Sequence, residues 1–205
     1  MPELGIVTTL SGGGRTVLNL LDRIEQGRLD ARILLAIANR TCAGIERLAA
    51  RGLEVDLVPW TKETTPEDFA ARVCPRIEAT GARLVCHCGF LRMLRIPEAW
   101  KNRVMNIHPA LLPAYGGKGM YGARVHAAVL AAGEKQSGCT VHFSNNEYDA
   151  GPIIVQRRVP VLPEDTPESL AARVFEQECE AYPEAVQLFA EGRISVEQGK
   201  VVITP

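Results

Sequence analysis

The chain has 205 residues, of which 46% are hydrophobic and 23% charged, and its formal net charge is -1. A chain of this length can bury one sizeable core but is short for two, so we expect a single domain over residues 1–205. The balanced charge creates no field that would attract nucleic acid or anionic lipid. We therefore expect no nucleic acid and no membrane as partners, and the composition indicates no particular oligomeric state.

The sequence also argues against export and disulfide bonding. The N-terminal stretch MPELGIVTTLSGGG has no basic segment and reaches Gly12 before any long apolar run, which is unlike a secretory signal. No later apolar run approaches the roughly 18 residues that a membrane span needs. The six cysteines are spread along the chain rather than grouped in a dense disulfide framework, so we expect them to be reduced. These features predict a cytoplasmic protein.

The first half of the chain alternates strand and helix patterns. Apolar runs typical of buried strands cover residues 4–10, 31–38, 53–59, 82–88 and 103–109. Helical patterns lie between them, over residues 16–27, 43–52 and 66–81. This alternation predicts an α/β fold, with a Rossmann-like, mostly parallel twisted sheet and helices on both faces.

The second half departs from this alternation. A helix and two strands are predicted, in this order, over residues 125–133, 138–144 and 152–161. The polar sequence NNEYDAG joins the two strands, and so short a connection predicts an antiparallel pair. Residues 166–192 predict one long C-terminal helix, capped by Thr166 and bent near Pro183.

A glycine-rich loop, SGGGRT over residues 11–16, follows the first predicted strand and opens a helix. Backbone N–H groups at a helix N-terminus suit phosphate, and Arg15 favours an anion there. The loop lacks both the G-x-G-x-x-G spacing and the G-K-[ST] ending of known nucleotide loops. A tight turn that needs glycine only for backbone reasons is therefore the alternative interpretation.

Asn106 and His108 lie two residues apart in the fifth predicted strand, so their side chains point to the same face. Pro109 and Pro113 end that strand and open it into a loop. Ligands of α/β sheets usually bind at such strand ends, which makes this pair a candidate site. A strand-end histidine satisfied by the backbone is the alternative.

Four stretches, taken together, resemble the glycinamide ribonucleotide formyltransferase family: SGGG, GFLRML over residues 89–94, NIHPALLP over residues 106–113 and GCTVHFSNNEYDAGPII over residues 138–154. The third and fourth stretches are the specific ones. The resemblance implies the formyltransferase fold and an enzyme that uses 10-formyltetrahydrofolate as co-substrate, without a metal. It implies transfer of the formyl group to the amine of 5'-phosphoribosylglycinamide in de novo purine (IMP) biosynthesis.

The resemblance also implies roles for individual residues. The implied catalytic residues are Asn106, His108 and Asp149. The residues implied to contact the folate are Leu91, Arg92, Met93 and Leu94, together with Asn106. The residues implied to hold the ribonucleotide are Gly13, Gly14, Arg15 and Thr16 at its phosphate and Glu178 at its ribose or glycinamide end.

The chemistry needs no serine or cysteine nucleophile, because the substrate supplies the attacking amine. Attack on the formyl carbon creates an oxyanion, which Asn106 and a protonated His108 would stabilise, each donor being worth roughly 3 kcal/mol. Asp149 would favour the charged imidazole and help to move the proton from the amine to the departing folate nitrogen.

The chain departs from the family pattern at three loops. The first loop usually reads S-G-N-G-[ST]-N, so the asparagine is replaced here by Gly13 and a small polar residue by Arg15. Lys62 stands where the family offers an arginine to the folate. The loop AYGGKGMYGARVH has extra glycines, and its Lys118 either reaches an anionic substrate group or is simply solvated.

Cys86, His87 and Cys88 invite a metal site, but alternation along a strand points the thiols and the imidazole to opposite faces. Packing under helices is the better interpretation of these side chains. His142 is assigned a packing or supporting role.

Other functions share the implied catalytic residues. A formyltetrahydrofolate hydrolase carries an additional N-terminal domain, and a methionyl-tRNA formyltransferase an additional RNA-binding domain; we expect neither, since this chain starts directly at the first strand and is not basic. A sugar-nucleotide amine formyltransferase differs only in its acceptor loops and stays open. A non-catalytic folate- or nucleotide-binding module is the alternative outside enzymes.

Overall fold

The computed structural model describes residues 3–204. The chain divides into two compact units, Met1–Met105 and Asn106–Pro205. The boundary between the units falls inside a strand, β5 (Val104–His108). The expectation of a single domain stays a prediction.

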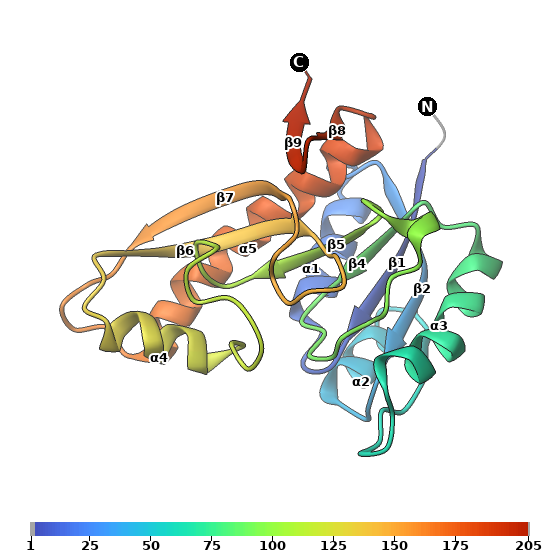
Figure 1. Ribbon diagram of the computed structural model, residues 1–205. Helices are drawn as coiled ribbons and strands as arrows, with labels where there is room; N and C mark the ends of the chain where they lie inside the picture. The colour runs from blue at the N-terminus through green and yellow to red at the C-terminus, as the bar shows by residue number, and fades with distance from the viewer. Residues whose placement is uncertain (1–2, 205) are drawn as a thin grey trace. The chain divides into compact units, whose positions relative to one another are not determined.

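The first unit contains four parallel strands in the order β3-β2-β1-β4. Figure 1 labels three of them, β2, β1 and β4. The four strands are β1 (Leu4–Leu10), β2 (Ala31–Ala38), β3 (Val55–Leu57) and β4 (Leu84–His87). The helices between them are α1 (Arg15–Glu25), α2 (Ala43–Ala49) and α3 (Pro66–Thr80). The strand and helix alternation predicted for this half of the chain is confirmed.

The two faces of these strands bury different helices. On one face, Phe69 and Val73 of α3 belong to a core cluster with Val7 of β1 and other apolar side chains of the unit. Val17 and Leu20 of α1 are fully buried but lie outside that cluster. Right-handed crossovers produce this distribution, because the chain moves one way across the sheet through α1 and α2 and the other way through α3.

Strand β5 continues the sheet. Within the first unit it starts beside β4, since the N–H of Val85 donates to the carbonyl of Arg103 at 2.9 Å. In the second unit it is followed by β6 (Gln136–Phe143) and β7 (Ile153–Pro160), which pair antiparallel with a register shift between Val141 and His142. The strand order is β3-β2-β1-β4-β5-β6-β7, which confirms a mostly parallel sheet with one antiparallel pair.

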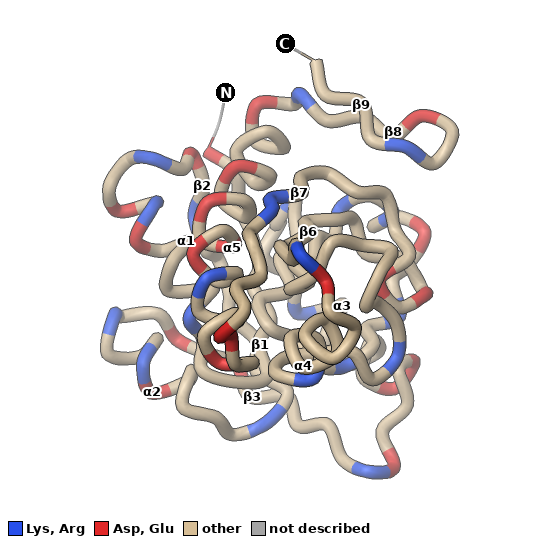
Figure 2. Tube along the Cα trace, turned by 90° about the vertical axis from the view of Figure 1, so that its left-hand side faces the viewer, with Lys and Arg blue, Asp and Glu red and all other residues tan. Residues whose placement is uncertain are grey.

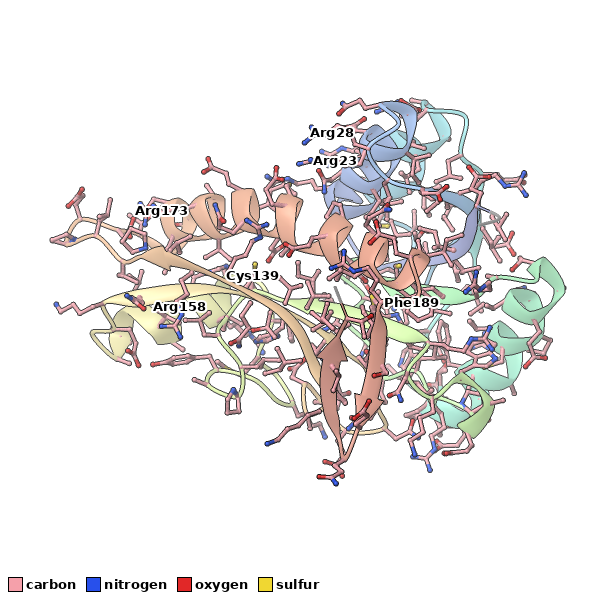
Figure 3. The ribbon with its side chains drawn as sticks, turned by 90° about the horizontal axis from the view of Figure 1, so that it is seen from above. Arg23, Arg28, Cys139, Arg158, Arg173 and Phe189 are labelled. Carbon is pink, nitrogen blue, oxygen red and sulfur yellow. The ribbon has the colours of Figure 1, made fainter. Side chains whose placement is uncertain are left out.

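Two helices accompany these strands in the second unit, α4 (Ala123–Ala131) and α5 (Pro167–Ala190). The long helix α5 runs along β6 and β7, and Cys139 of β6 lies between strand and helix (Figure 3). Thr166 caps α5 as predicted, accepting the N–H of Ser169 in a reciprocal capping box. Pro183 lies inside the helix, while the predicted bend there stays a prediction.

A terminal hairpin and a short turn were not predicted. The hairpin pairs β8 (Ile194–Glu197) with β9 (Lys200–Ile203), and η1 (Glu98–Trp100) is one 3-10 turn. Each hairpin strand has only four residues, and Gln198 and Gly199 both have positive φ at the turn. Gln-Gly is a weak turn signal compared with Asn-Gly, which explains why the pattern was missed.

Acidic and basic residues are interspersed along both units, as Figure 2 shows. Between residues 3 and 204, no helix is long and apolar enough to cross a membrane.

Candidate active site

Strand β5 delivers two polar side chains to one face, as the alternation predicts. Asn106 is half-buried and His108 is only 3% exposed, while Met105 and Ile107 are buried on the other face. The loop after the strand is fixed by β6, because the Thr140 hydroxyl donates to the carbonyl of Ala110 at 2.7 Å. The end of β5 therefore has a defined position relative to β6 within the second unit.

Asp149 reaches the same place from the loop between β6 and β7. Its Oδ2 lies 3.5 Å from Nδ1 of His108 and accepts the N–H of Gly117 at 2.9 Å. Its Oδ1 lies 3.6 Å from Nε2 of His142. The residue adopts a left-handed backbone with φ +53°, which aspartate tolerates better than most residues. Asn106, His108 and Asp149 thus lie together, and His142 joins them.

Glycines allow the loops around Asp149 to approach closely. A Cβ on Gly116 would lie 3.2 Å from Cβ of Asp149 and 2.6 Å from a methyl carbon of Leu112. A Cβ on Gly151 would overlap the carbonyl oxygen of Phe143. Space therefore requires glycine at position 151, where the contact is with backbone, whereas at position 116 the side chain of Leu112 would have to move.

His142 orients Asn106. Its Nδ1 donates to the carbonyl oxygen of Phe143 at 2.9 Å, which leaves Nε2 as an acceptor for the Asn106 amide nitrogen at 3.3 Å. This hydrogen bond uses one of the two N–H donors of the amide, and the second can serve a ligand oxygen. The sequence identified His142 only as a supporting residue; its position next to Asp149 on the hairpin was the available signal.

The protonation of His108 is set by opposing influences. Its Nε2 donates to the carbonyl oxygen of Tyr115 at 2.8 Å, so in the neutral ring Nδ1 faces Asp149 with its lone pair. Burial lowers the pKa of His108, outweighing the charge of Asp149 and the Tyr115 carbonyl, which act to raise it. The substrate-free ring is therefore neutral at pH 7, with a carboxylate placed to support a second proton.

Asp149 remains ionised beside these rings. Burial alone would raise its pKa, but the neighbouring His142, the charge of His108 and the Gly117 N–H outweigh burial and lower the pKa. The cluster therefore combines a carboxylate that is 12% exposed with two imidazoles and an amide. Together these groups can donate hydrogen bonds to an oxyanion and relay a proton.

The predicted phosphate loop lies in the first unit. Gly14 is the N-cap of α1 with φ +71°, and α1 has no side-chain cap and no acidic residue in its first turn. Gly13 is half-buried, Arg15 is exposed and Thr16 is half-buried at the start of the helix. An uncapped helix N-terminus without acidic residues suits an anion.

The predicted folate segment also lies in the first unit, directly after β4. The N–H of Leu91 donates to the Ser11 hydroxyl at 2.8 Å. Leu91 is 39% exposed whereas Leu94 is 2% exposed and belongs to the core cluster of α3. The Arg92 guanidinium carbon lies 5.4 Å from the centre of the Trp60 ring, and Met93 is half-buried. Lys62 is exposed in the loop between β3 and α3.

Glu178 lies on α5 and faces β6. The pKa of the Cys139 thiol is raised to about 12. Burial is the largest cause, and the charge of Glu178 is the next. Cys139 precedes Thr140 on β6, so its side chain points away from the face that carries the Thr140 hydroxyl. The implied contact of Glu178 with the ribose or glycinamide stays a prediction.

Cys86, His87 and Cys88 are buried in the first unit. Nδ1 of His87 lies 2.7 Å from the Thr9 hydroxyl, and its ring stacks on Phe90 with centres 5.1 Å apart. Within residues 3–204, no group of three or more His, Cys, Asp or Glu side chains is arranged to hold a metal ion. The six cysteines are free thiols.

Fold and polar cluster together define an α/β protein with a candidate catalytic site at the end of a sheet strand. Residues 4–186 match the formyl transferase family. The chain belongs to this family.

Individual relatives agree with this assignment. The chloroplastic phosphoribosylglycinamide formyltransferase of Arabidopsis thaliana is 37% identical over 189 residues, which are 90% of this chain and 65% of that protein. This chain thus spans less than two thirds of the plant relative. Glycinamide ribonucleotide transformylase 1 from Symbiobacterium toebii has a similar crystal structure, with a TM-score of 0.91 and 38% identity over 98% of this chain and 94% of that one. The phosphoribosylglycinamide formyltransferase structure from Coxiella burnetii gives a TM-score of 0.86 at 33% identity, covering 98% and 93%.

Proposed function

We propose that the protein transfers a formyl group from 10-formyltetrahydrofolate to the amine of 5'-phosphoribosylglycinamide, a step of purine biosynthesis. The observation that carries this proposal is the cluster of Asn106, His108 and Asp149, in which Oδ2 of Asp149 lies 3.5 Å from Nδ1 of His108 and the Asn106 amide is hydrogen-bonded to His142. Family membership and the names of the relatives support the substrate pair.

In the proposed reaction, the substrate amine attacks the formyl carbon and the formyl oxygen becomes an oxyanion. The second N–H of the Asn106 amide donates to this oxygen. Nε2–H of His108 also donates to it, after exchanging its present hydrogen bond with the Tyr115 carbonyl. Nδ1 of His108, which faces Asp149, takes up the proton that the attacking amine loses, so that the ring becomes charged only when negative charge develops beside it.

The intermediate then collapses to products. The attacking nitrogen must lose a proton and the folate nitrogen must gain one before the bond between that nitrogen and the formyl carbon breaks. Asp149 and His108 provide the groups for this transfer, since both can carry the proton and their side chains are only 12% and 4% exposed. The reaction as proposed uses no metal.

The remaining site assignments are part of the same proposal. Leu91 to Leu94 contact the folate, partly through backbone groups, and Lys62 is the candidate replacement for the family arginine. The loop from Gly13 to Thr16 holds the substrate phosphate, and Glu178 holds its ribose or glycinamide end. We place this activity in the cytoplasm, in a single domain that acts on small molecules.

Release of tetrahydrofolate, followed by absorbance, tests the proposal. We expect release only when phosphoribosylglycinamide is present. Release without any amine would indicate a hydrolase, and release only with an amino sugar nucleotide would indicate a different acceptor. Folate binding without release under any of these conditions would indicate a binding module.

A further inference from the structure

The glycine-rich loop after β1 is held from one side by residues 40–47, which we call the clamp segment. This segment comprises the loop after β2 and the first five residues of α2. Three consecutive carbonyl oxygens of the glycine loop accept hydrogen bonds from it: Ser11 from Arg40 Nε at 2.6 Å, Gly12 from the Gly44 N–H at 3.0 Å and Gly13 from Arg47 Nη1 at 3.0 Å.

This pattern fixes the direction of the loop's amide groups. In a planar trans peptide the C=O and the following N–H point in opposite directions. Because the carbonyls of Ser11, Gly12 and Gly13 point to the clamp segment, the N–H groups of the residues that follow them point away from it. Successive N–H groups turned to one side, at the start of a helix, form a concave site for an anion.

The clamp segment depends on close contact at Gly44. A Cβ on Gly44 would lie 2.6 Å from the carbonyl oxygen of Gly12 and 3.0 Å from the nitrogen of Gly14. Two guanidinium groups, those of Arg40 and Arg47, flank this contact and bring positive charge to the loop. A Cβ on Gly13 would lie 3.0 Å from Nη1 of Arg47, so the glycine leaves the space that the guanidinium uses.

We infer that Arg40 and Arg47 are positioning residues for the phosphate of the amine substrate. They orient the glycine loop through its carbonyls and add charge beside it, at a helix start where α1 has neither a capping side chain nor an acidic residue in its first turn. The inference rests on the proposed function, because it concerns the phosphate site of that same reaction. It adds two residues, from a segment about 30 positions away, to a site that the sequence assigned to the glycine loop alone.

Arg47→Gln is the main test. We expect the KM for phosphoribosylglycinamide to rise about tenfold, because a charge-assisted contact is lost at the phosphate loop. We expect kcat and the folate KM to stay within about twofold, and the KM for the same amine without its phosphate to stay unchanged. Arg47→Lys should recover part of the loss, since it keeps the charge but not the fork of donors. Arg32→Gln, an exposed arginine on β2, is the matched control.

Ribose 5-phosphate provides a readout that needs no activity. It should raise the melting temperature of the wild-type protein, raise it less in Arg40→Gln and Arg47→Gln, and raise it as much as in wild type in Arg32→Gln. Equal protection of all variants would overturn the inference, as would no protection of the wild type.

Kinetics separate the inference from the proposed function. If the wild type shows no transfer to phosphoribosylglycinamide, the proposed function fails, whatever ribose 5-phosphate does. If the wild type transfers and Arg47→Gln raises the KM equally for the amines with and without phosphate, the proposed function stands and the phosphate role of Arg47 fails.

Discussion

Two imidazole rings converge on Asp149, whose carboxylate oxygens lie 3.5 Å from His108 and 3.6 Å from His142. In the proposed reaction the carboxylate supports a proton on His108. It also lies beside Nε2 of His142, the ring nitrogen that accepts the amide of Asn106. One negative charge thus lies next to both histidines of the site.

Replacing Asp149 by asparagine tests this role. We expect kcat to fall by at least about 100-fold while both KM values change little, because the interaction is made only as charge develops. The NMR titration of His108 should shift to lower pH, since the carboxylate raises the pKa of that ring against burial. Glu147→Gln, in the same loop but exposed, should leave both quantities unchanged. Retention of most of the kcat in Asp149→Asn would make Asp149 a turn residue only.

At the scale of elements, the β6–β7 hairpin brings the residues of the candidate site together. It carries His142 on one strand and Asp149 in its connection, and its Thr140 fixes the loop after β5. The sequence predicted both strands and their antiparallel pairing from the short polar connection. It did not predict the hydrogen bond between Asn106 and His142, because local periodicity gives the face of each strand but not the contact across strands.

Gly151→Ala tests how far the hairpin depends on that connection. Because a Cβ there overlaps the carbonyl oxygen of Phe143, the loop must shift, and we expect a loss of more than about 2 kcal/mol in the free energy of unfolding together with a large loss of kcat. Urea unfolding followed by circular dichroism measures the first quantity. Gly12→Ala, where a Cβ meets nothing within 4 Å, should cost far less stability. Equal stability of the two variants would show that the hairpin loop adapts.

At the scale of the whole chain, local sequence pattern predicted the architecture but not the contacts between residues far apart in the sequence. The predicted bounds of β1 and β2 agree with the structure, because both are continuous apolar runs between turn residues. Strand β3 is shorter than the predicted 53–59, since only Val55–Leu57 pair with β2. The clamp segment was not predicted, because its contacts with the glycine loop join residues 29 to 34 positions apart with no shared motif.

Buried histidines should make global stability depend on pH. Burial is the largest cause that lowers the pKa of both His108 and His126. Such a histidine has a folded pKa below its unfolded value of about 6.5, so the unfolded chain binds the proton more readily. Its contribution to the free energy of unfolding is therefore complete above that pH and is lost as the pH falls. The free energy of unfolding should therefore fall from pH 7.5 to 5.5, by up to about 1.4 kcal/mol per pH unit for each ring.

His126→Gln isolates one of these contributions. His126 lies on α4 and is 3% exposed. The variant should show a shallower decrease of the unfolding free energy between pH 7.5 and 5.5, whatever its stability at pH 7.5. An unchanged slope would mean that the ring is not held neutral in the folded protein.

The fate of the formyl carbon tests the proposed function most directly. The protein is incubated with 10-formyltetrahydrofolate labelled with ¹³C at the formyl carbon and with phosphoribosylglycinamide, and the label is followed by NMR in wild type and in Asp149→Asn. We predict that the wild type moves the label into an amide bond with the glycinamide nitrogen and that the variant does so at least about 100-fold more slowly. Label that appears as formate, or that stays on the folate, would contradict the proposed transfer.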